Sequence, residues 1–361
     1  MRVGFDRQTF TIQKYGGVSR YFTDLYLGLS QSPEIEAELL FTWHQNAYLT
    51  EHGIGRNLHP LAAKCYIKGL SHGNFELPLS KKHDIHHSTF YLGRPKKQKG
   101  NTRLITTLYD MIPETFPGFK EKKVHANKLD WLNSSDLIVS ISDSSAEDLA
   151  YLQPHLAERI RKIHLYSGFS KESVQTKPAA ILDNDNPYHL FVGNRRGYKN
   201  ADMLFRAFAA SEPKRHRHYL LMAGGGTLLK EEQDSITRLG IGDCVKQVNV
   251  SDSELWYLYK NAASVLVPSM AEGFSLPLVE GLVADAPILC SDISIHREVA
   301  GQFATLVNPL NYQDWADILL DHKKMKSPSE KISEKDYKDK CNYYNRERMI
   351  ADHIKLYKSI A

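Results

Sequence analysis

The chain has 361 residues, of which 42% are hydrophobic and 24% charged, a composition typical of a globular protein long enough for two domains. A net charge of +4 is too small to indicate nucleic-acid binding, so we expect no nucleic-acid partner. No run of about 18 apolar residues occurs, and the N-terminus begins with a strand-like Val-Gly-Phe segment rather than a signal peptide. We therefore expect neither export nor a membrane span, but a cytoplasmic protein.

Short β-rich runs alternate with helical patterns along the first half of the chain. Strands are expected at 2–6, 39–41, 104–108 and 137–140, and helices at 18–30 and 120–133. This alternation predicts a doubly wound α/β domain at residues 1–175. A stretch rich in Lys, Pro, Asn and Asp follows at about 170–187 and indicates a domain boundary.

The alternation restarts after this boundary. Strands are expected at 188–193, 219–224, 245–250 and 264–268, and helices at 200–210, 231–239 and 253–261. A second α/β domain is therefore predicted at 176–342. The last stretch, from about 343 to 361, contains an amphipathic helix in which Met349, Ile350 and Tyr357 recur near helical spacing.

Basic residues are concentrated between positions 94 and 128, where nine lysines and arginines outnumber three acidic residues. Two interpretations fit this region: a surface that contacts an anionic membrane or a phosphate-bearing acceptor, and an ordinary solvated loop and helix face. The first would place the protein peripherally at the inner face of the plasma membrane. The basic residues are Arg94, Lys96, Lys97, Lys99, Arg103, Lys120, Lys122, Lys123 and Lys128.

The cysteines and a histidine cluster give no sign of a metal site. Cys65, Cys244, Cys290 and Cys341 lack metal or redox spacing, so we expect reduced thiols and no disulfide. The sequence His-Asp-Ile-His-His at 83–87 reads as a strand whose alternate residues face one way, without matching carboxylates or cysteines. We predict no bound metal, and we expect His87, at the strand end, to be able to contact a ligand.

The segment 271–286 carries two carboxylates, Glu272 and Glu280, on either side of a Gly-Phe-Ser-Leu-Pro turn. An apolar run at 263–268 precedes it. Pro277 stands where a helix can begin, because the missing N–H of proline costs nothing there. The segment is therefore predicted to be a strand, a turn and a helix start.

A helix start offers unpaired N–H groups, and those of Ser275 and Leu276 would point at a diphosphate. Glu280 is expected in the first helical turn, where it can accept hydrogen bonds from sugar hydroxyls, while Glu272 reaches another part of the same ligand. The alternative is that Glu280 interacts only with the helix dipole and that the turn binds nothing.

A second polar turn follows the strand expected at 188–193. The sequence Gly-Asn-Arg-Arg-Gly-Tyr-Lys brings Arg195, Arg196 and Lys199 to the carboxyl edge of the sheet, where open α/β sheets bind ligands. Fixed cations there can stabilise the negative charge that develops on a departing diphosphate. The alternative is a basic turn at the surface.

Weaker signals follow other strands. Gly16 and Gly17 separate the first strand from the first long helix, and Gly224 lies in a Met-Ala-Gly-Gly-Gly run after a strand; such glycines let the backbone approach a ligand closely. Asp110 stands just beyond the strand at 104–108. Each of these patterns is also common in ordinary turns.

Taken together, these motifs resemble glycosyltransferase family 4, whose members are retaining enzymes of the GT-B fold. Their E-x7-E motif is usually written Glu-Gly-Phe-Gly-Leu-Pro-x-x-Glu, and it matches the stretch from Glu272 to Glu280 with Ser275 in place of glycine. The family has a His-Asp turn where this chain has Tyr109 and Asp110, so any role of that imidazole is in doubt here.

The resemblance implies two Rossmann-like α/β domains that face each other across a cleft. Residues 1–175 would bind the acceptor and residues 176–342 the donor, with the helix at about 343–361 packing back on the first domain.

The resemblance also implies roles for single residues. Lys199 would hold the donor diphosphate together with Arg195 or, as its rival, Arg196. Glu272 would hold hydroxyls of the transferred sugar, and Glu280 the ribose. Further donor contacts would come from Gly16, Gly17, Gly193, Gly224, Val250 (through its backbone, near the base), Phe274, Ser275 and Leu276.

The implied reaction is the transfer of a hexose from a UDP-, GDP- or ADP-sugar to an acceptor hydroxyl, with retention and without a metal or other cofactor. Asp110 would orient the acceptor or the sugar, and the leaving phosphate would assist deprotonation of the acceptor. A bacterial surface polysaccharide or a lipid-linked glycan is the expected acceptor. A nicotinamide-dependent oxidoreductase is disfavoured because no Gly-x-Gly-x-x-Gly follows the first strand. A non-catalytic protein of the same fold that binds sugar nucleotides or glycans remains the alternative.

Overall fold

The computed structural model describes residues 1–57, 83–95, 100–117, 119, 125–179, 186–195, 197–213 and 217–360. The chain divides into two compact units, one made of Met1–Leu165 with Arg346–Ala361 and the other of Tyr166–Asn345. The boundary expected after residue 175 falls inside the second unit.

The first unit is built on a parallel sheet. Among the described residues its strands follow the order β2-β1-β5-β6-β7-β8, so the sheet grows in one direction from β1 to β2 and in the other from β1 to β5. Their bounds are β1 Arg2–Phe5, β2 Glu36–Leu39, β5 Ile85–Ser88, β6 Arg103–Leu108, β7 Leu137–Ser140 and β8 Ile160–Lys162, with a separate pair β3 Trp43–His44 and β4 Arg56–Asn57.

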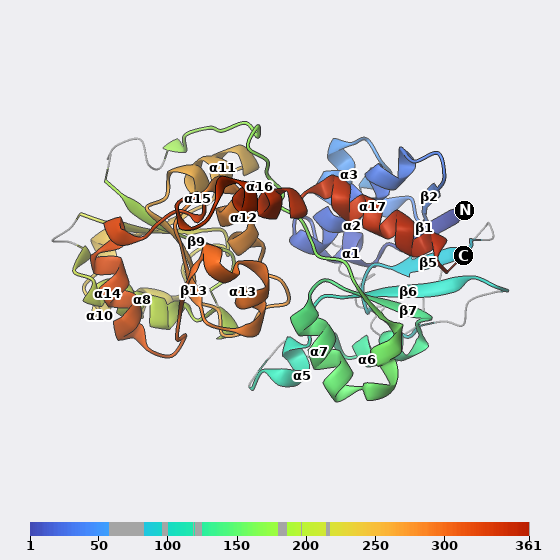
Figure 1. The fold of residues 1–361 in the computed structure, drawn as a ribbon, viewed down its shortest axis with the longest axis horizontal. Coiled ribbons are helices and arrows are strands. Elements are labelled where there is room, and N and C mark those ends of the chain that lie inside the picture. Colours follow the sequence, from blue (N-terminus) through green and yellow to red (C-terminus); the bar gives the residue numbers. More distant parts are fainter. Residues whose placement is uncertain are drawn as a thin grey trace. The chain divides into compact units, whose positions relative to one another are not determined.

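Helices cover both faces of this sheet (Figure 1), as expected for a doubly wound domain. The helices α2 and α17 lie on one face, and α6 and α7 lie on the other, where Leu108, Leu132, Ile138 and Leu149 form a buried cluster. The helical bounds are α1 Gln8–Ile12, α2 Gly17–Ser30, α3 Ala47–Glu51, α5 Ile112–Thr115, α6 Lys128–Ser134, α7 Asp143–Leu152, the 3₁₀ turn η2 Pro154–Arg159 and α17 Arg346–Lys358.

The last helix, α17, completes the first unit. It packs along α2, and its Met349, His353 and Tyr357 are fully buried. Tyr21 on α2 lies 2.7 Å from Nε2 of His353, and Tyr357 lies 2.7 Å from Nδ1 of His87 on β5. Residues from the two ends of the sequence therefore share one core.

The second unit repeats the parallel α/β design. Among the described residues its strands follow the order β11-β10-β9-β12-β13-β14, so β9 is the strand from which the sheet grows in both directions. Their bounds are β9 Tyr188–Val192, β10 Tyr219–Ala223, β11 Val245–Val248, β12 Ser264–Val267, β13 Ile288–Ser291 and β14 Thr305–Val307.

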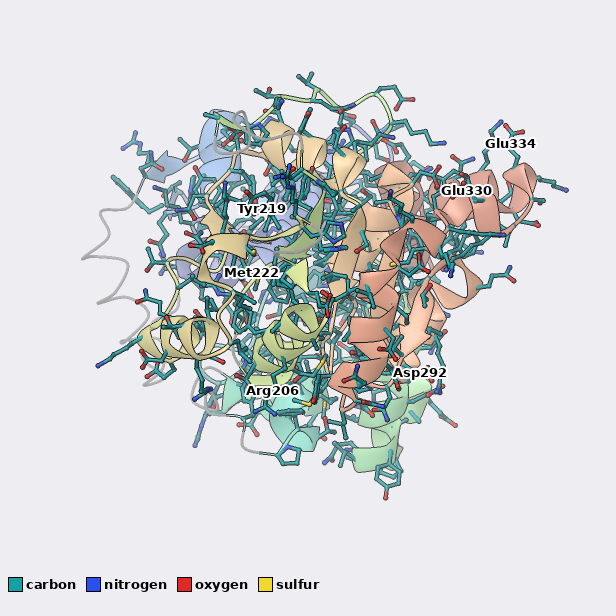
Figure 2. The ribbon with its side chains drawn as sticks, turned by 90° about the vertical axis from the view of Figure 1, so that its left-hand side faces the viewer. Arg206, Tyr219, Met222, Asp292, Glu330 and Glu334 are labelled. Atoms are coloured by element: carbon teal, nitrogen blue, oxygen red, sulfur yellow. The ribbon has the colours of Figure 1, made fainter. Side chains whose placement is uncertain are left out.

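Helices α8 and α14 pack on one face of the second sheet, and α11 and α12 lie on the other (Figure 1). Met222 on β10 belongs to the buried cluster of the first face, whereas Arg206 on α8 lies at the surface (Figure 2). The helical bounds are α8 Ala201–Ala210, α10 Lys230–Arg238, α11 Asp252–Asn261, α12 Leu276–Ala284, α13 Ser294–Val299, α14 Tyr312–Leu320, α15 Pro328–Lys331 and α16 Glu334–Tyr343, with 3₁₀ turns η4 Gly197–Lys199, η5 Gly242–Cys244, η6 Gly301–Phe303 and η7 His322–Lys324.

The predicted α/β class is confirmed, and the differences are local. The expected helix at 120–133 begins at Lys128 within the described part of the chain. The short helix α1 and the strands β13 and β14 were not predicted. No described helix has the length and apolar character needed to cross a membrane, and Cys244, Cys290 and Cys341 are free thiols.

Candidate functional site

The strand order of the second unit defines where a ligand can bind. In open α/β sheets ligands bind outside the carboxyl ends of the strands, at the point where the order reverses. Here that point lies between β9 and β12, which pair in parallel. The segments that follow these two strands contain the predicted residues Gly193 to Lys199 and Glu272 to Leu276.

These two segments are tied together by hydrogen bonds. The backbone N–H of Met270 donates to the carbonyl of Tyr198 at 2.7 Å, and the side-chain amide of Asn200 donates to the carbonyl of Pro268 at 3.1 Å. The positions of the side chains on the two segments are therefore fixed relative to one another.

Lys199 and Glu272 form an ion pair across these segments. Nζ of Lys199 lies 2.6 Å from Oε1 of Glu272, and the hydroxyl of Ser269 donates to the same oxygen at 2.7 Å. Their side chains are 15% and 8% exposed, so the pair is largely shielded from water. A cation and a hydrogen-bond acceptor thus stand side by side at the carboxyl edge of the sheet.

The turn after Glu272 leads into α12. Phe274 is buried, its ring 5.9 Å from that of Tyr344, so it supports the turn from inside. Ser275 is the N-cap in the left-handed region, with φ of 71°, and its buried hydroxyl has no hydrogen-bond partner among the described residues. Leu276 is the first helical residue and Pro277 the second, which confirms the predicted helix start.

Glu280 does not lie where the sequence placed it. It is in the second turn of α12, because the helix begins at Leu276, and it is buried with 7% exposure. The expected interaction with the helix dipole in the first turn is therefore wrong. Its carboxyl lies beside Tyr259 of α11, where burial and then the Glu280 charge raise the pKa of the phenol well above its ordinary value.

Arg195 turns away from the Lys199–Glu272 pair. Its guanidinium donates to the carbonyls of Gly224 at 2.8 Å and Gly226 at 2.9 Å and pairs with Glu232 at 3.0 Å. Its donors thus hold a glycine turn, and this geometry speaks against the predicted direct contact with a diphosphate. The rival, Arg196, lies outside the described residues.

The glycine turn held by Arg195 has an unusual backbone. Gly224, Gly225 and Gly226 all have positive φ, between 70° and 78°, a conformation that other residues rarely adopt. In this conformation their carbonyl oxygens face the Arg195 guanidinium. Gly193 also has positive φ, and its N–H donates to the carbonyl of Ala223 at 2.9 Å. Both predicted glycines, Gly193 and Gly224, therefore shape this edge through their backbone.

Val250 lies in the loop between β11 and α11, partly exposed. Immediately after it, Ser251 caps α11 and forms a capping box with Glu254. Glu254 is thus a capping residue of α11.

In the first unit the glycine pair begins α2. Gly16 is the N-cap and Gly17 the first helical residue. The side chain of Gln13 accepts a hydrogen bond from the N–H of Ser19 at 3.0 Å, and a Cβ on Gly16 would lie only 2.4 Å from that Gln13 oxygen. The short helix α1 separates β1 from these glycines, so they do not follow the strand directly.

Asp110 follows β6, and its Oδ1 accepts a hydrogen bond at 3.0 Å from the N–H of Ile112, the first residue of α5. Lys128 is fully buried and donates to the backbone carbonyl of Asp110 and to Glu114. Tyr109 is buried, and its hydroxyl donates to the carbonyl of Thr89 at 2.8 Å. The side chain that replaces the family histidine therefore joins two strand ends of the first sheet.

One expectation for the first unit needs correction, and a second concerns mostly residues outside the described part of the chain. His87 is fully buried between Tyr357 and Thr107, so it does not reach a ligand. Of the basic region at 94–128, Lys128 is buried and Arg103 pairs with Asp136, so neither contributes a free surface charge. Lys96, Lys97, Lys99, Lys120, Lys122 and Lys123 lie outside the described residues.

One residue near the ion pair was missed. His296 on α13 is fully buried, and Glu272 and Lys199 both act on it electrostatically. A lone histidine in a helix carries no signal in sequence, because its neighbours come from other strands.

A scan of protein families matches residues 174–339 to the group described as glycosyl transferases group 1. The chain is 27% identical over 250 residues to the O-antigen chain mannosyltransferase B of Escherichia coli, covering 63% of this chain and 62% of the relative. It is 24% identical over 171 residues to the O-antigen chain mannosyltransferase RfbU of Salmonella typhimurium, covering 43% and 48%. The chain therefore spans about half to three-fifths of these curated relatives.

The fold is also found in solved structures. The chain superposes on HepE of Anabaena, solved in complex with UDP and glucose, with a TM-score of 0.69, 17% identity and coverage of 99% and 100%. Two parallel α/β units with this likeness define a protein of the GT-B fold. Residues 174–339 match the group 1 glycosyltransferases, the family to which the E-x7-E resemblance pointed.

Proposed function

We propose that this protein is a retaining glycosyltransferase that moves a hexose from a nucleoside-diphosphate sugar to a hydroxyl of a glycan or lipid-linked acceptor. The observation that carries the proposal is the Lys199–Glu272 pair, joined at 2.6 Å where the strand order of the second unit reverses. The match of this unit to the group 1 glycosyltransferases supports it.

The two partners suit the two halves of such a donor. The ammonium of Lys199 can bind the diphosphate and stabilise the charge that develops as the sugar departs. The carboxylate of Glu272 can accept hydrogen bonds from sugar hydroxyls. The N–H groups at the start of α12, at Ser275 and Leu276, add positive potential for the phosphates.

Other residues take supporting roles in the proposal. Glu280, in the second turn of α12, binds the ribose. Arg195 positions the glycine turn at 224–226, which shapes the nucleotide side of the site. Asp110 in the first unit orients the acceptor.

The substrate class follows from the relatives. Two of them are named as mannosyltransferases of O-antigen chains, so we propose mannose as the hexose and bacterial surface polysaccharide assembly as the setting. The Lys199 ammonium and the N–H groups at the start of α12 can stabilise the departing diphosphate without a divalent metal, and the proposed enzyme is metal-independent. Contact with an anionic membrane through the region 94–128 remains part of the proposal.

The test measures binding and transfer separately. Thermal shift with GDP-mannose, UDP-glucose and ADP-glucose identifies the donor, because a ligand at 100 times its Kd stabilises by about 2.7 kcal/mol. Transfer to lipid-linked acceptor is then assayed with and without EDTA. We expect equal rates in both conditions and a loss of about 100-fold or more in Lys199→Ala and Glu272→Ala.

A matched control is available in the same unit. Lys338 and Glu334 form an exposed pair on α16, and Glu334 lies at the outer edge of the unit (Figure 2). We expect Lys338→Ala to keep full activity. Unchanged transfer in both Lys199→Ala and Glu272→Ala would refute the proposed site, and donor binding without transfer to any acceptor would favour a non-catalytic binding protein.

A further inference from the structure

Buried polar atoms without a partner are rare in folded proteins, and each one calls for an explanation. Three lie, within the described structure, at the end of β13 or in the segments that follow β12 and β13: Oγ of Ser275, Oγ of Ser291 and Nε2 of His296. The histidine is the most informative, because its ring is fully buried and its other nitrogen is engaged.

The tautomer of His296 follows from its one hydrogen bond. Nδ1 lies 2.8 Å from the carbonyl oxygen of Ser291. A carbonyl oxygen only accepts, so Nδ1 carries the proton and the neutral ring leaves Nε2 as an acceptor with no donor. His296 can therefore take a proton at Nε2 without losing the bond to Ser291.

The charges that act on this ring are Lys199 and Glu272. Burial lowers the pKa of His296; the Glu272 carboxylate opposes this change and the Lys199 ammonium adds to it. Burial outweighs the Glu272 carboxylate, whose effect on the pKa of His296 is larger than that of Lys199, so with the ion pair intact the ring is neutral at pH 7.

Among the described residues on the elements that pack against α13, the other charged groups face different partners. On α12, which packs against α13, Glu280 faces Tyr259. The turn η6, which also packs against α13, contains no titratable residue. On α13 itself, Arg297 pairs with Asp292 at 2.6 Å on the exposed side, and Glu298 lies near Lys340 of α16.

We propose that His296 replaces Lys199 as the partner of Glu272 when a nucleoside diphosphate draws Lys199 away. This inference rests on the proposed function, which supplies the anion. One proton from solvent binds Nε2, the imidazole becomes an imidazolium, and no other bond is made or broken. His296 is thus a positioning residue that keeps Glu272 ionised and oriented toward the sugar.

The physical reason is the cost of an unpaired buried charge. Without Lys199, the largely buried Glu272 would keep Ser269 as a donor but lose its cation. The phosphates add further negative charge. Both changes favour the protonated ring, so ligand binding and proton uptake are coupled.

The test counts protons. Titration calorimetry of UDP, GDP and ADP at pH 7, in buffers of different ionisation enthalpy, gives the number of protons exchanged on binding. We expect wild type to take up more protons than His296→Asn, by a large part of one proton. Asparagine keeps a donor for the Ser291 carbonyl and lacks Nε2, and protonation of the nucleotide itself cancels in the comparison.

Two further variants make the result decisive. His189 is equally buried, with Nδ1 2.7 Å from the Ser264 hydroxyl, but it lies near the start of β9, at the opposite end of the strand from the site. We therefore expect His189→Asn to take up as many protons on nucleotide binding as wild type. His296→Gln offers a non-titrating donor near the Nε2 position, and we expect it to bind within a few fold of wild type without the extra uptake.

Equal proton uptake in wild type, His296→Asn and His296→Gln, with normal nucleotide binding, would overturn this inference alone. Absence of binding by all three nucleotides would overturn the proposed function together with it.

Discussion

Ser275 carries two energetic costs at one position. Its φ of 71° lies in the left-handed region, which costs a residue with a Cβ about 1–2 kcal/mol. Its hydroxyl is buried without a partner in the described part of the chain, which adds a second cost of about 1–3 kcal/mol. A residue kept under such strain at the start of α12, beside the Lys199–Glu272 pair, suggests a site where the backbone conformation matters more than stability.

Replacement by glycine removes both costs. We expect Ser275→Gly to raise the free energy of unfolding by about 1 kcal/mol, since the relieved strain exceeds the extra flexibility of the unfolded chain. Urea denaturation measures this change. Ser275→Ala keeps the strained backbone, so its free energy of unfolding should rise by less than that of Ser275→Gly. A glycine variant less stable than wild type would show that the hydroxyl has a stabilising contact.

His353 makes the first unit sensitive to acid. Its Nδ1–H donates to the carbonyl of Met349 at 2.8 Å, and its Nε2 accepts from the hydroxyl of Tyr21 at 2.7 Å, so the ring is held neutral. Burial lowers the pKa of His353 from 6.5 to about 4. The pKa of the neighbouring His87 is also lowered well below its ordinary value, chiefly by burial.

The unfolded chain therefore binds this proton at a higher pH than the folded one. Stability should fall from about pH 6.5 downward and continue to fall to about pH 4, with a loss of about 1 kcal/mol from His353 at pH 5.5. Urea midpoints at pH 7.5 and 5.5 test this. The drop should shrink in His353→Gln and persist in His155→Gln, whose side chain is at the surface; an equal drop in both variants would contradict the assignment.

At the scale of single elements, the glycine turn after β10 depends on Arg195, a side chain from the loop after the neighbouring strand β9. Arg195 and Glu232 are 2% and 12% exposed, and the guanidinium also binds carbonyls of the turn. Removing one member of a buried pair leaves the other charge without compensation.

We expect Arg195→Ala to lower the free energy of unfolding by about 3 kcal/mol, and Arg195→Lys to recover only part of it because an ammonium lacks the planar fork. Denaturation of the two variants checks this. If Arg195→Ala were as stable as wild type but had lost nucleotide affinity, Arg195 would be a ligand-binding residue, as the sequence suggested.

The elements show what sequence can and cannot predict. The strands β9, β10 and β12 and the start of α12 at Pro277 were predictable, because apolar runs and proline act locally. The direction of Arg195 was not, because it depends on the positive φ of glycines about thirty residues later. Likewise α1 has five residues, too few for a periodic pattern.

The candidate site was also predictable only where local sequence signals determine the structure. The approach of Lys199 to Glu272 could be anticipated, because both follow parallel strands and the carboxyl ends of such strands meet at one edge. Their direct ion pair and the buried ring of His296 could not, because contacts between separate loops leave no periodic trace in the sequence.

At the scale of the whole molecule, the first unit is discontinuous in sequence. Its helix α17 is separated from the rest of the unit by the entire second unit. Deleting residues 346–361 removes Met349, His353 and Tyr357 from the core, and loss of each such side chain costs about 2–5 kcal/mol.

We expect this deletion to leave the first unit unfolded and the second unit folded. Limited proteolysis should then cut within residues 1–165 and spare 166–345. The variant Lys355→Ala changes an exposed position of α17 and should leave both units protected. A protease-resistant first unit in the truncated chain would show that α17 is dispensable.

The path of α17 also sets an order for events on the ribosome. The strands and helices of the first unit emerge early, but the helix that closes their core emerges after the last residue of the second unit. Translation of the first unit thus begins before that of the second unit but is completed after it. Until then, the side chains of α2 and β5 that α17 contacts, among them Tyr21 and His87, stay exposed to chaperones. The time needed to translate the second unit therefore sets how long the first unit stays incomplete.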